Sequence, residues 1–247
     1  MFNQPIPIVT KNLLIINGLF FGAMMLLGSS FNIDLNTYLA LHYWDSSNFQ
    51  PFQLITYMFM HSGTHFSHIL FNMFALWMFG SAIENYWGPK RFLVYYFVTG
   101  IGAGVIQLLT IYIQIQSVIP GISPEMIELV RREGYDALMQ NKNFIDPAMA
   151  SYNYLINSTV VGASGSVFGL LLAFGMMFPN TPIYLMFIPV PIKAKYMVMG
   201  YGLLELYSGF SNNPNDNVAH FAHLGGMLFG IILILYWKKK GSFYNPY

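Results

Sequence analysis

A serine between small residues and two groups of histidines are the residues of this chain best suited to chemistry. Ser164 lies in the run Gly162-Ala-Ser-Gly165, and five of the six histidines fall within residues 61–68 and 220–223. A serine hydroxyl becomes a nucleophile when a base lies within about 2.6–3.2 Å of it, and imidazole is a common base near neutral pH. These residue types predict nucleophilic catalysis, with Ser164 attacking and His223 accepting its proton.

The segments that must position these residues are strongly apolar. Hydrophobic residues make up 55% of the chain and charged residues 9%, and the mean hydropathy is +0.49. Soluble domains carry about 25% charged residues, so much of this surface must face lipid. A membrane-spanning helix needs about 20 apolar residues. Six spans are expected, at residues 13–27, 63–79, 92–115, 154–178, 196–210 and 218–237.

The predicted fold class is therefore an all-α polytopic membrane protein, with residues 1–247 as a single membrane domain. Six spans place both termini on one side, and that side carries eight of the eleven Lys and Arg residues. The positive-inside rule makes both termini cytoplasmic. We expect an integral multi-pass protein of a bacterial inner membrane. The net charge of +1 argues against nucleic acid as a partner.

Two segments interrupt the expected spans. Residues 117–153 hold five of the ten acidic residues of the chain. There Ser123 suits an N-cap and Pro124 a first helical position, which predicts an amphipathic helical insertion in an outer loop. Residues 182–191 are apolar but broken by prolines, so an interfacial loop is expected rather than a span.

The polar residues of the second, fourth and sixth spans fall at one depth, because these three spans all begin at the outer face. Polar groups inside a membrane are costly and usually face one another or a cavity. Each feature alone has a simpler explanation, since a histidine can reach the interface and a glycine-flanked serine often marks helix packing. Their convergence favours one shared site, formed by His61, His65, His68, Asn72, Ser164, His220 and His223.

Close contact between the fourth and sixth spans is needed to join the serine to its base. Small-xxx-small spacing predicts such contact and occurs twice, in Gly165 with Gly169 and in Gly226 with Gly230. Phe168 lies one helical turn below Ser164, so its ring is expected to pack flat on the imidazole of His223.

Donors for a tetrahedral oxyanion are also present. His68 and Asn72 lie four residues apart and share a helix face. Their side chains and the Ser164 backbone N–H are suited to stabilise the developing charge. Glu205 lies below the outer end of a different helix, so no carboxylate is expected to orient His223. The sequence therefore predicts a Ser–His dyad rather than a triad.

Four motifs in this order resemble those of the rhomboid intramembrane serine proteases, over about residues 13–237. They are HxxxN (His68 to Asn72), GxxxExxxG (Gly80, Glu84, Gly88), GxSG (Gly162 to Gly165) and AHxxGxxxG (Ala222 to Gly230). The resemblance implies a six-transmembrane-helix rhomboid-like bundle. It implies Ser164 as nucleophile, His223 as base, and His68 with Asn72 at the oxyanion.

The resemblance also implies three further features of the fold. These are a first-loop hairpin lying sideways in the membrane, a cap loop at about residues 209–217, and a fifth helix near the path of substrate access. Two departures from the family pattern stand out. Phe52-Gln53 occupies the place where the first loop commonly carries Trp-Arg, and the insertion at 117–153 is longer than a minimal rhomboid needs.

The protein is expected to be an intramembrane serine endopeptidase that acts on single-span membrane-protein substrates in the lipid bilayer. No cofactor and no metal are expected. Two alternatives stay open. One is a catalytically inactive rhomboid-like protein that binds membrane clients, although this chain keeps both the serine and the histidine. The other is a metal transporter or metalloenzyme built on the histidine cluster. Against this second alternative, the sequence has no HExxH motif and no carboxylate among the histidines.

Overall fold

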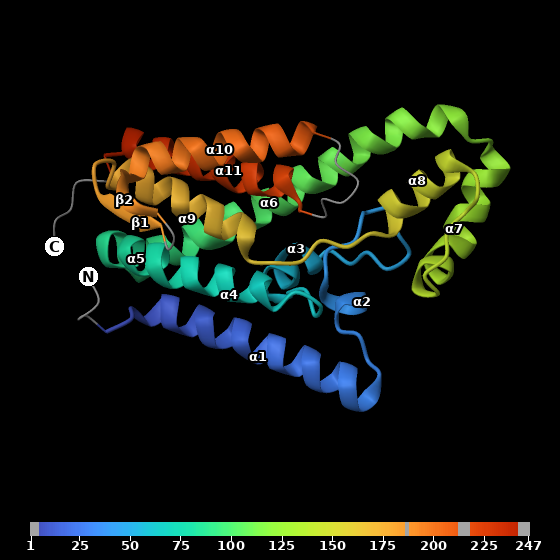
Figure 1. Ribbon diagram of the computed structural model, residues 1–247, viewed down its shortest axis with the longest axis horizontal. Coiled ribbons are helices and arrows are strands. Elements are labelled where there is room, and N and C mark those ends of the chain that lie inside the picture. Colours follow the sequence, from blue (N-terminus) through green and yellow to red (C-terminus); the bar gives the residue numbers. More distant parts are fainter. Residues whose placement is uncertain (1–4, 186–187, 212–217, 242–247) are drawn as a thin grey trace.

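A computed structural model describes residues 5–185, 188–211 and 218–241, and these form a bundle of helices with one small hairpin (Figure 1). The long helices are α1 (Ile8–Phe31), α6 (Pro89–Val118), α10 (Ala194–Phe210) and α11 (His220–Lys239). A further segment runs through α4 (Phe66–Ala75), the π-helical turn η2 (Leu76–Gly80) and α5 (Ser81–Trp87). The shorter helices are α2 (Asn36–Leu39), α3 (Gln53–Thr56), the 3₁₀ turns η1 (Tyr57–Phe59) and η3 (Ile119–Gly121), α7 (Pro124–Met139), α8 (Pro147–Asn157) and α9 (Ser164–Met177).

Four segments are long and apolar enough to cross a membrane by length and composition: Ile8–Phe31, Phe66–Trp87, Pro89–Gly121 and His220–Lys239. α9 and α10, with 14 and 17 residues, are shorter than these four segments. α1 begins and α11 ends at the same end of the bundle (Figure 1). The described residues thus form a helical polytopic membrane bundle, while the count of six spans stays a prediction.

The expectation of one continuous span over residues 154–178 is wrong. α8 ends at Asn157, and α9 starts only at Ser164, after a loop that contains Gly162 at φ +126°. A helix cannot continue through a positive-φ glycine. α9 packs against α6 and α11, and ten of its fourteen residues are buried, so neighbouring helices cover it. Ser164 is consequently the first residue of a short, enclosed helix.

The insertion contains two helices where one was expected. Ser123 caps α7 by accepting a hydrogen bond from Met126 N, as predicted. α8 was missed, although Asp146-Pro147 supplies the same kind of start: Asp146 Oδ1 accepts from Met149 N at 2.9 Å and Pro147 takes the first helical position. The two helices pack together beyond the end of the bundle, next to α6 (Figure 1).

The proline-broken segment after α9 forms an antiparallel hairpin. β1 (Pro182–Leu185) pairs with β2 (Ile188–Lys193), with Pro182 opposite Lys193 and Ile183 opposite Ile192. It lies at the end of the bundle opposite the insertion (Figure 1). The expectation that this segment is not a span is met, and the irregular loop is replaced by paired strands.

Glu84 joins the N-terminal helix to the rest of the bundle. Its carboxylate is buried and accepts hydrogen bonds from Val9 N, Thr10 N and Thr10 Oγ1 at 2.7–2.9 Å. These backbone N–H groups belong to the first turn of α1, where a helix has unpaired donors and favours negative charge. Gly88, at φ +79°, then ends α5, and Pro89 starts α6 directly after it.

The first loop is held by Gln53, at the position where the resemblance led us to expect arginine. Gln53 is fully buried, and its Nε2 donates to Tyr38 O and Asn48 O at 3.1 and 2.9 Å. Its Oε1 accepts from His42 N and Gln50 N. A neutral amide therefore fastens both ends of this loop without a buried charge.

Candidate functional site

The backbones of α9 and α11 touch at one pair of glycines. A Cβ added to Gly226 would lie 1.9 Å from the carbonyl oxygen of Gly165, which leaves no room for any side chain. The second glycine of each predicted pair has another neighbour. Gly169 faces Thr99 on α6, and Gly230 faces the Tyr95 hydroxyl, also on α6. The predicted contact between the two helices is therefore present at the end that carries Ser164 and His223, and α6 fills the interface farther along them.

Gly162 lies between Ser164 and His68. A Cβ added to Gly162 would be 2.8 Å from His68 Nε2 and 3.6 Å from Ser164 Oγ. His68 Nδ1 accepts a hydrogen bond from Ser62 N at 3.4 Å, so in the neutral ring the proton is on Nε2. The N–H of this ring is thus directed to the space beside the serine.

The ring of His223 is held flat against Phe168. The two ring centroids are 4.1 Å apart and the planes differ by 7°, which is the stacking expected from the sequence. His223 is buried in α11. In the part of the chain that the structure describes, no hydrogen bond joins Ser164 Oγ to this imidazole. Catalytic hydrogen bonds commonly shorten only when substrate binds.

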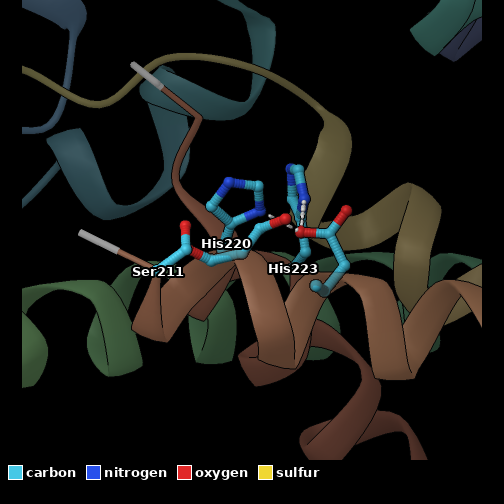
Figure 2. A network of polar contacts seen from close by, with 5 residues as sticks. Ser211, His220 and His223 are labelled. Atoms are coloured by element: carbon cyan, nitrogen blue, oxygen red, sulfur yellow. Dashed lines mark hydrogen bonds and ion pairs between the residues drawn. The ribbon is translucent and has the colours of Figure 1, made fainter. Parts of the chain in front are cut away.

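The expectation that no carboxylate reaches His223 is wrong. Glu205 Oε2, on α10, lies 2.9 Å from His223 Nδ1 and 2.6 Å from His220 Nδ1 (Figure 2). Depth along separate spans was a poor guide, because α10 packs beside α11 and the long glutamate side chain crosses between them. One signal could have revealed this pair: a single acidic residue inside an apolar span needs a polar partner.

The remaining predicted residues are only partly brought together. Asn72 is buried, and its Nδ2 donates to His68 O on its own helix at 2.9 Å. His61 is buried with its ring centroid 5.2 Å from that of His68. His65 lies instead in the loop before α4, where its Nδ1 lies 2.9 Å from Thr64 Oγ1. His61 and His68 thus form one pair, and His220 and His223 form another around Glu205.

The carboxylate of Glu205 also creates a group of three side chains that could in principle bind a metal ion. Glu205, His220 and His223 each offer one ligand atom, and these atoms lie within 4.8 Å of one another. The sequence argument against a metal had relied on the lack of a carboxylate among the histidines. The two nitrogen–oxygen separations of 2.6 and 2.9 Å are hydrogen-bond lengths. Two ligands of one tetrahedral zinc ion would lie about 3.3 Å apart, so these separations fit direct hydrogen bonds better than a shared zinc ion.

Fold and site together define a helical, polytopic membrane protein with a serine and paired histidines between its helices. The Rhomboid domain family matches residues 48–124 and 141–240, and the chain belongs to the rhomboid family.

Two curated relatives come from Arabidopsis thaliana. The chain is 28% identical over 194 residues to RHOMBOID-like protein 12, mitochondrial, which covers 77% of this chain and 47% of that protein. It is 23% identical over 193 residues to Rhomboid-like protein 16, chloroplastic, covering 77% and 50%. The chain spans about half the length of these relatives. Both names are organellar, so they give no support to the expected bacterial inner membrane.

Proposed function

We propose that this rhomboid family member is an intramembrane serine endopeptidase that cleaves transmembrane segments of single-span membrane proteins. The observation that carries the proposal is the contact between Gly165 and Gly226, which brings the start of α9 against α11. Ser164 and His223 lie at this end of the two helices. Such an approach is what a serine nucleophile and its base require.

In the proposed mechanism, Ser164 Oγ attacks the carbonyl carbon of the cleaved peptide bond while His223 takes the hydroxyl proton. His223 then returns that proton to the leaving amine as the C–N bond breaks. A water molecule, deprotonated by the same imidazole, hydrolyses the acyl-enzyme and restores the serine. The oxyanion is stabilised by the Ser164 backbone N–H, by His68 Nε2–H and by the amide of Asn72. The orientation of His68 beside Gly162 supports this assignment.

The form of the substrate follows from the depth of the site. A peptide bond inside a helix is shielded by its own hydrogen bonds, so the cut segment has to unwind. We expect small or helix-breaking residues near the cleaved bond, at the outer end of the substrate span. Placing leucines there should slow cleavage, and faster cleavage of the leucine variant would contradict this account.

The test compares purified wild type, Ser164→Ala and chelator-treated wild type on a panel of single-span membrane proteins. We expect cleavage by wild type, none by Ser164→Ala and no effect of the chelator. A fluorophosphonate should label wild type at Ser164 alone. Activity that survives Ser164→Ala and disappears with chelator would support the alternative hypothesis of a metalloenzyme built on the histidines. A folded wild type that neither cleaves nor reacts with the probe would favour the client-binding reading.

Orientation in the membrane is part of the proposal. Eight of the eleven Lys and Arg residues lie in segments expected on the side of the termini, which makes that side cytoplasmic. Reporter fusions after Lys142 and after Lys240 should report opposite sides of the membrane. Finding both reporters on one side would refute the assignment.

A further inference from the structure

Glu205 is the titratable residue of α10 that meets the base of the proposed reaction. Its carboxylate oxygen Oε2 lies 2.9 Å from Nδ1 of His223 and 2.6 Å from Nδ1 of His220 (Figure 2). The side chains of all three residues are mostly buried, with 10–13% of their surface exposed. This contact is therefore shielded from bulk water. An ion pair exposed to water contributes little to stability, and that discount does not apply in full here.

The chemistry of the carboxylate determines the form of the ring it meets. An ionised carboxylate only accepts hydrogen bonds, so the His223 nitrogen that faces it carries the proton. A neutral imidazole with its proton on Nδ1 has its free lone pair on Nε2. That lone pair is what a base needs in order to take the proton of a serine hydroxyl.

Two contacts on different parts of the ring then fix its orientation. Glu205 holds the Nδ1 edge, and Phe168 covers one face at a centroid separation of 4.1 Å. A ring held at an edge and on a face cannot turn about its side-chain bonds without losing one of these contacts. The residue that supplies the edge contact comes from α10, not from the two helices that carry Ser164 and His223.

We propose that Glu205 is a positioning residue that completes a Ser164–His223–Glu205 triad, holding His223 in the Nδ1–H form and stabilising the imidazolium. This inference rests on the proposed serine-protease function. His220 shares the same oxygen, and a carboxylate oxygen has acceptor capacity for both donors.

The competing reading is that the carboxylate only satisfies two buried histidines. Both readings expect some loss of stability when Glu205 is replaced, so stability cannot decide between them. Tautomer and protonation of His223 can decide, because only positioning for catalysis alters kcat and its pH dependence while leaving KM nearly unchanged.

The experiment measures kcat, KM and the pH profile for wild type, Glu205→Ala, Glu205→Gln and Ser164→Ala on one cleaved substrate. Glu128→Gln serves as the matched control, because it removes an exposed carboxylate of α7. We expect Glu205→Ala to lower kcat by about 10²–10⁴, as loss of the carboxylate does in triad enzymes. The pH of half-maximal activity should fall, because the imidazolium loses its partner. Glu205→Gln should be at least as impaired, since its amide can donate to Nδ1 and force the proton onto Nε2.

A second measurement uses wild type alone, in case the variants do not fold. Nitrogen-15 spectra of histidine-labelled protein should show His223 in the Nδ1–H form above the pH of half-maximal activity. A predominantly Nε2–H form would overturn the proposal. So would Glu205 variants that stay within threefold of wild type with an unchanged pH profile, while Ser164→Ala is inactive. If Ser164→Ala is itself active, the protease function fails instead, which is a separate result.

Discussion

The carbonyl oxygen of Gly165 occupies the place where a side chain of Gly226 would begin, since a Cβ there would be only 1.9 Å away. Gly226→Val should push α9 from α11 and separate Ser164 from His223. Misplacement by about 1 Å can cost about a hundredfold in rate, so we expect at least that loss in kcat. The measurement is cleavage of a single-span substrate alongside fluorophosphonate labelling.

Gly200→Val on α10 is the matched control, because nothing lies within 4 Å of a Cβ at that position. It carries the same helix-propensity penalty without a close contact, and it should keep most of the activity. A Gly226→Val protein as active as Gly200→Val would mean that the glycine contact does not hold the site.

Gly162→Ala tests the position of His68. The new methyl group would lie 2.8 Å from His68 Nε2, at a backbone φ of +126° that an alanine rarely adopts. We expect kcat to fall about 10²–10³, as for loss of one oxyanion donor. Gly88→Ala shares the positive φ but has open space around the Cβ, so it should lose stability and keep activity. Equal loss of activity in both variants would assign the effect to backbone strain.

Asn72→Ala tests the second proposed oxyanion donor. We expect about 10²–10³ lower turnover with a nearly unchanged melting temperature. Asn17→Ala is a close match, because Asn17 is also buried and donates from Nδ2 to a carbonyl oxygen four residues earlier, that of Leu13. If both variants lose stability and keep turnover, Asn72 is a packing residue and leaves the proposed site.

Gln53→Leu should loosen the first loop. The substitution keeps the volume of the side chain but removes the partners of two carbonyl oxygens and two backbone N–H groups. Each buried polar group left without a partner costs about 1–3 kcal/mol. The melting temperature should fall by several degrees, and proteolysis between residues 32 and 52 should accelerate. Unchanged protection of this segment would show that the loop is anchored elsewhere.

Acid sensitivity should trace in part to His61. Burial, with a smaller contribution from His68, lowers the pKa of the His61 ring to about 4, against about 6.5 in an unfolded chain. The unfolded state then binds a proton more readily than the folded state. The folded state therefore keeps its full stability with respect to His61 above about pH 6.5, and loses stability as the pH falls toward 4. His61→Phe should flatten this decline in melting temperature, while His65→Gln, in the exposed loop, should not. An unchanged slope in His61→Phe would contradict the assignment.

The sequence predicted the presence of the apolar helices better than it predicted where each of them begins and ends. Hydropathy gave the cores of α1, α6 and α11 because lipid-facing helices must be apolar along their whole length. It failed for α9, because no charged residue separates its sequence from the preceding loop and the end of α8. Residues 158–163 are non-helical, with Val160 bridged to Leu41 and Gly162 at a positive φ, and a glycine in the sequence can equally lie inside a helix.

In the candidate site, too, some contacts could be predicted from the sequence and others could not. Stacking of Phe168 on His223 could be foreseen, because one helical turn separates Phe168 from Ser164. The bond from Glu205 to His223 could not be foreseen from depth, since it depends on which helices are neighbours. Spacing along one helix is readable from sequence, whereas the neighbour of a span is decided by packing.

Three of the seventeen residues of α10 are buried, and all three, Ala194, Met197 and Val198, lie in its first five positions. Its later turns, which carry Glu205, expose Leu203, Tyr207 and Phe210 to the surroundings of the bundle. In a membrane those surroundings are lipid acyl chains, so the lipids directly contact the helix that supplies the Glu205 carboxylate. A change in lipid chain length that shifts α10 along α11 alters the bond to His223. Rates in bilayers of different thickness should therefore vary more for wild type than for Glu205→Ala.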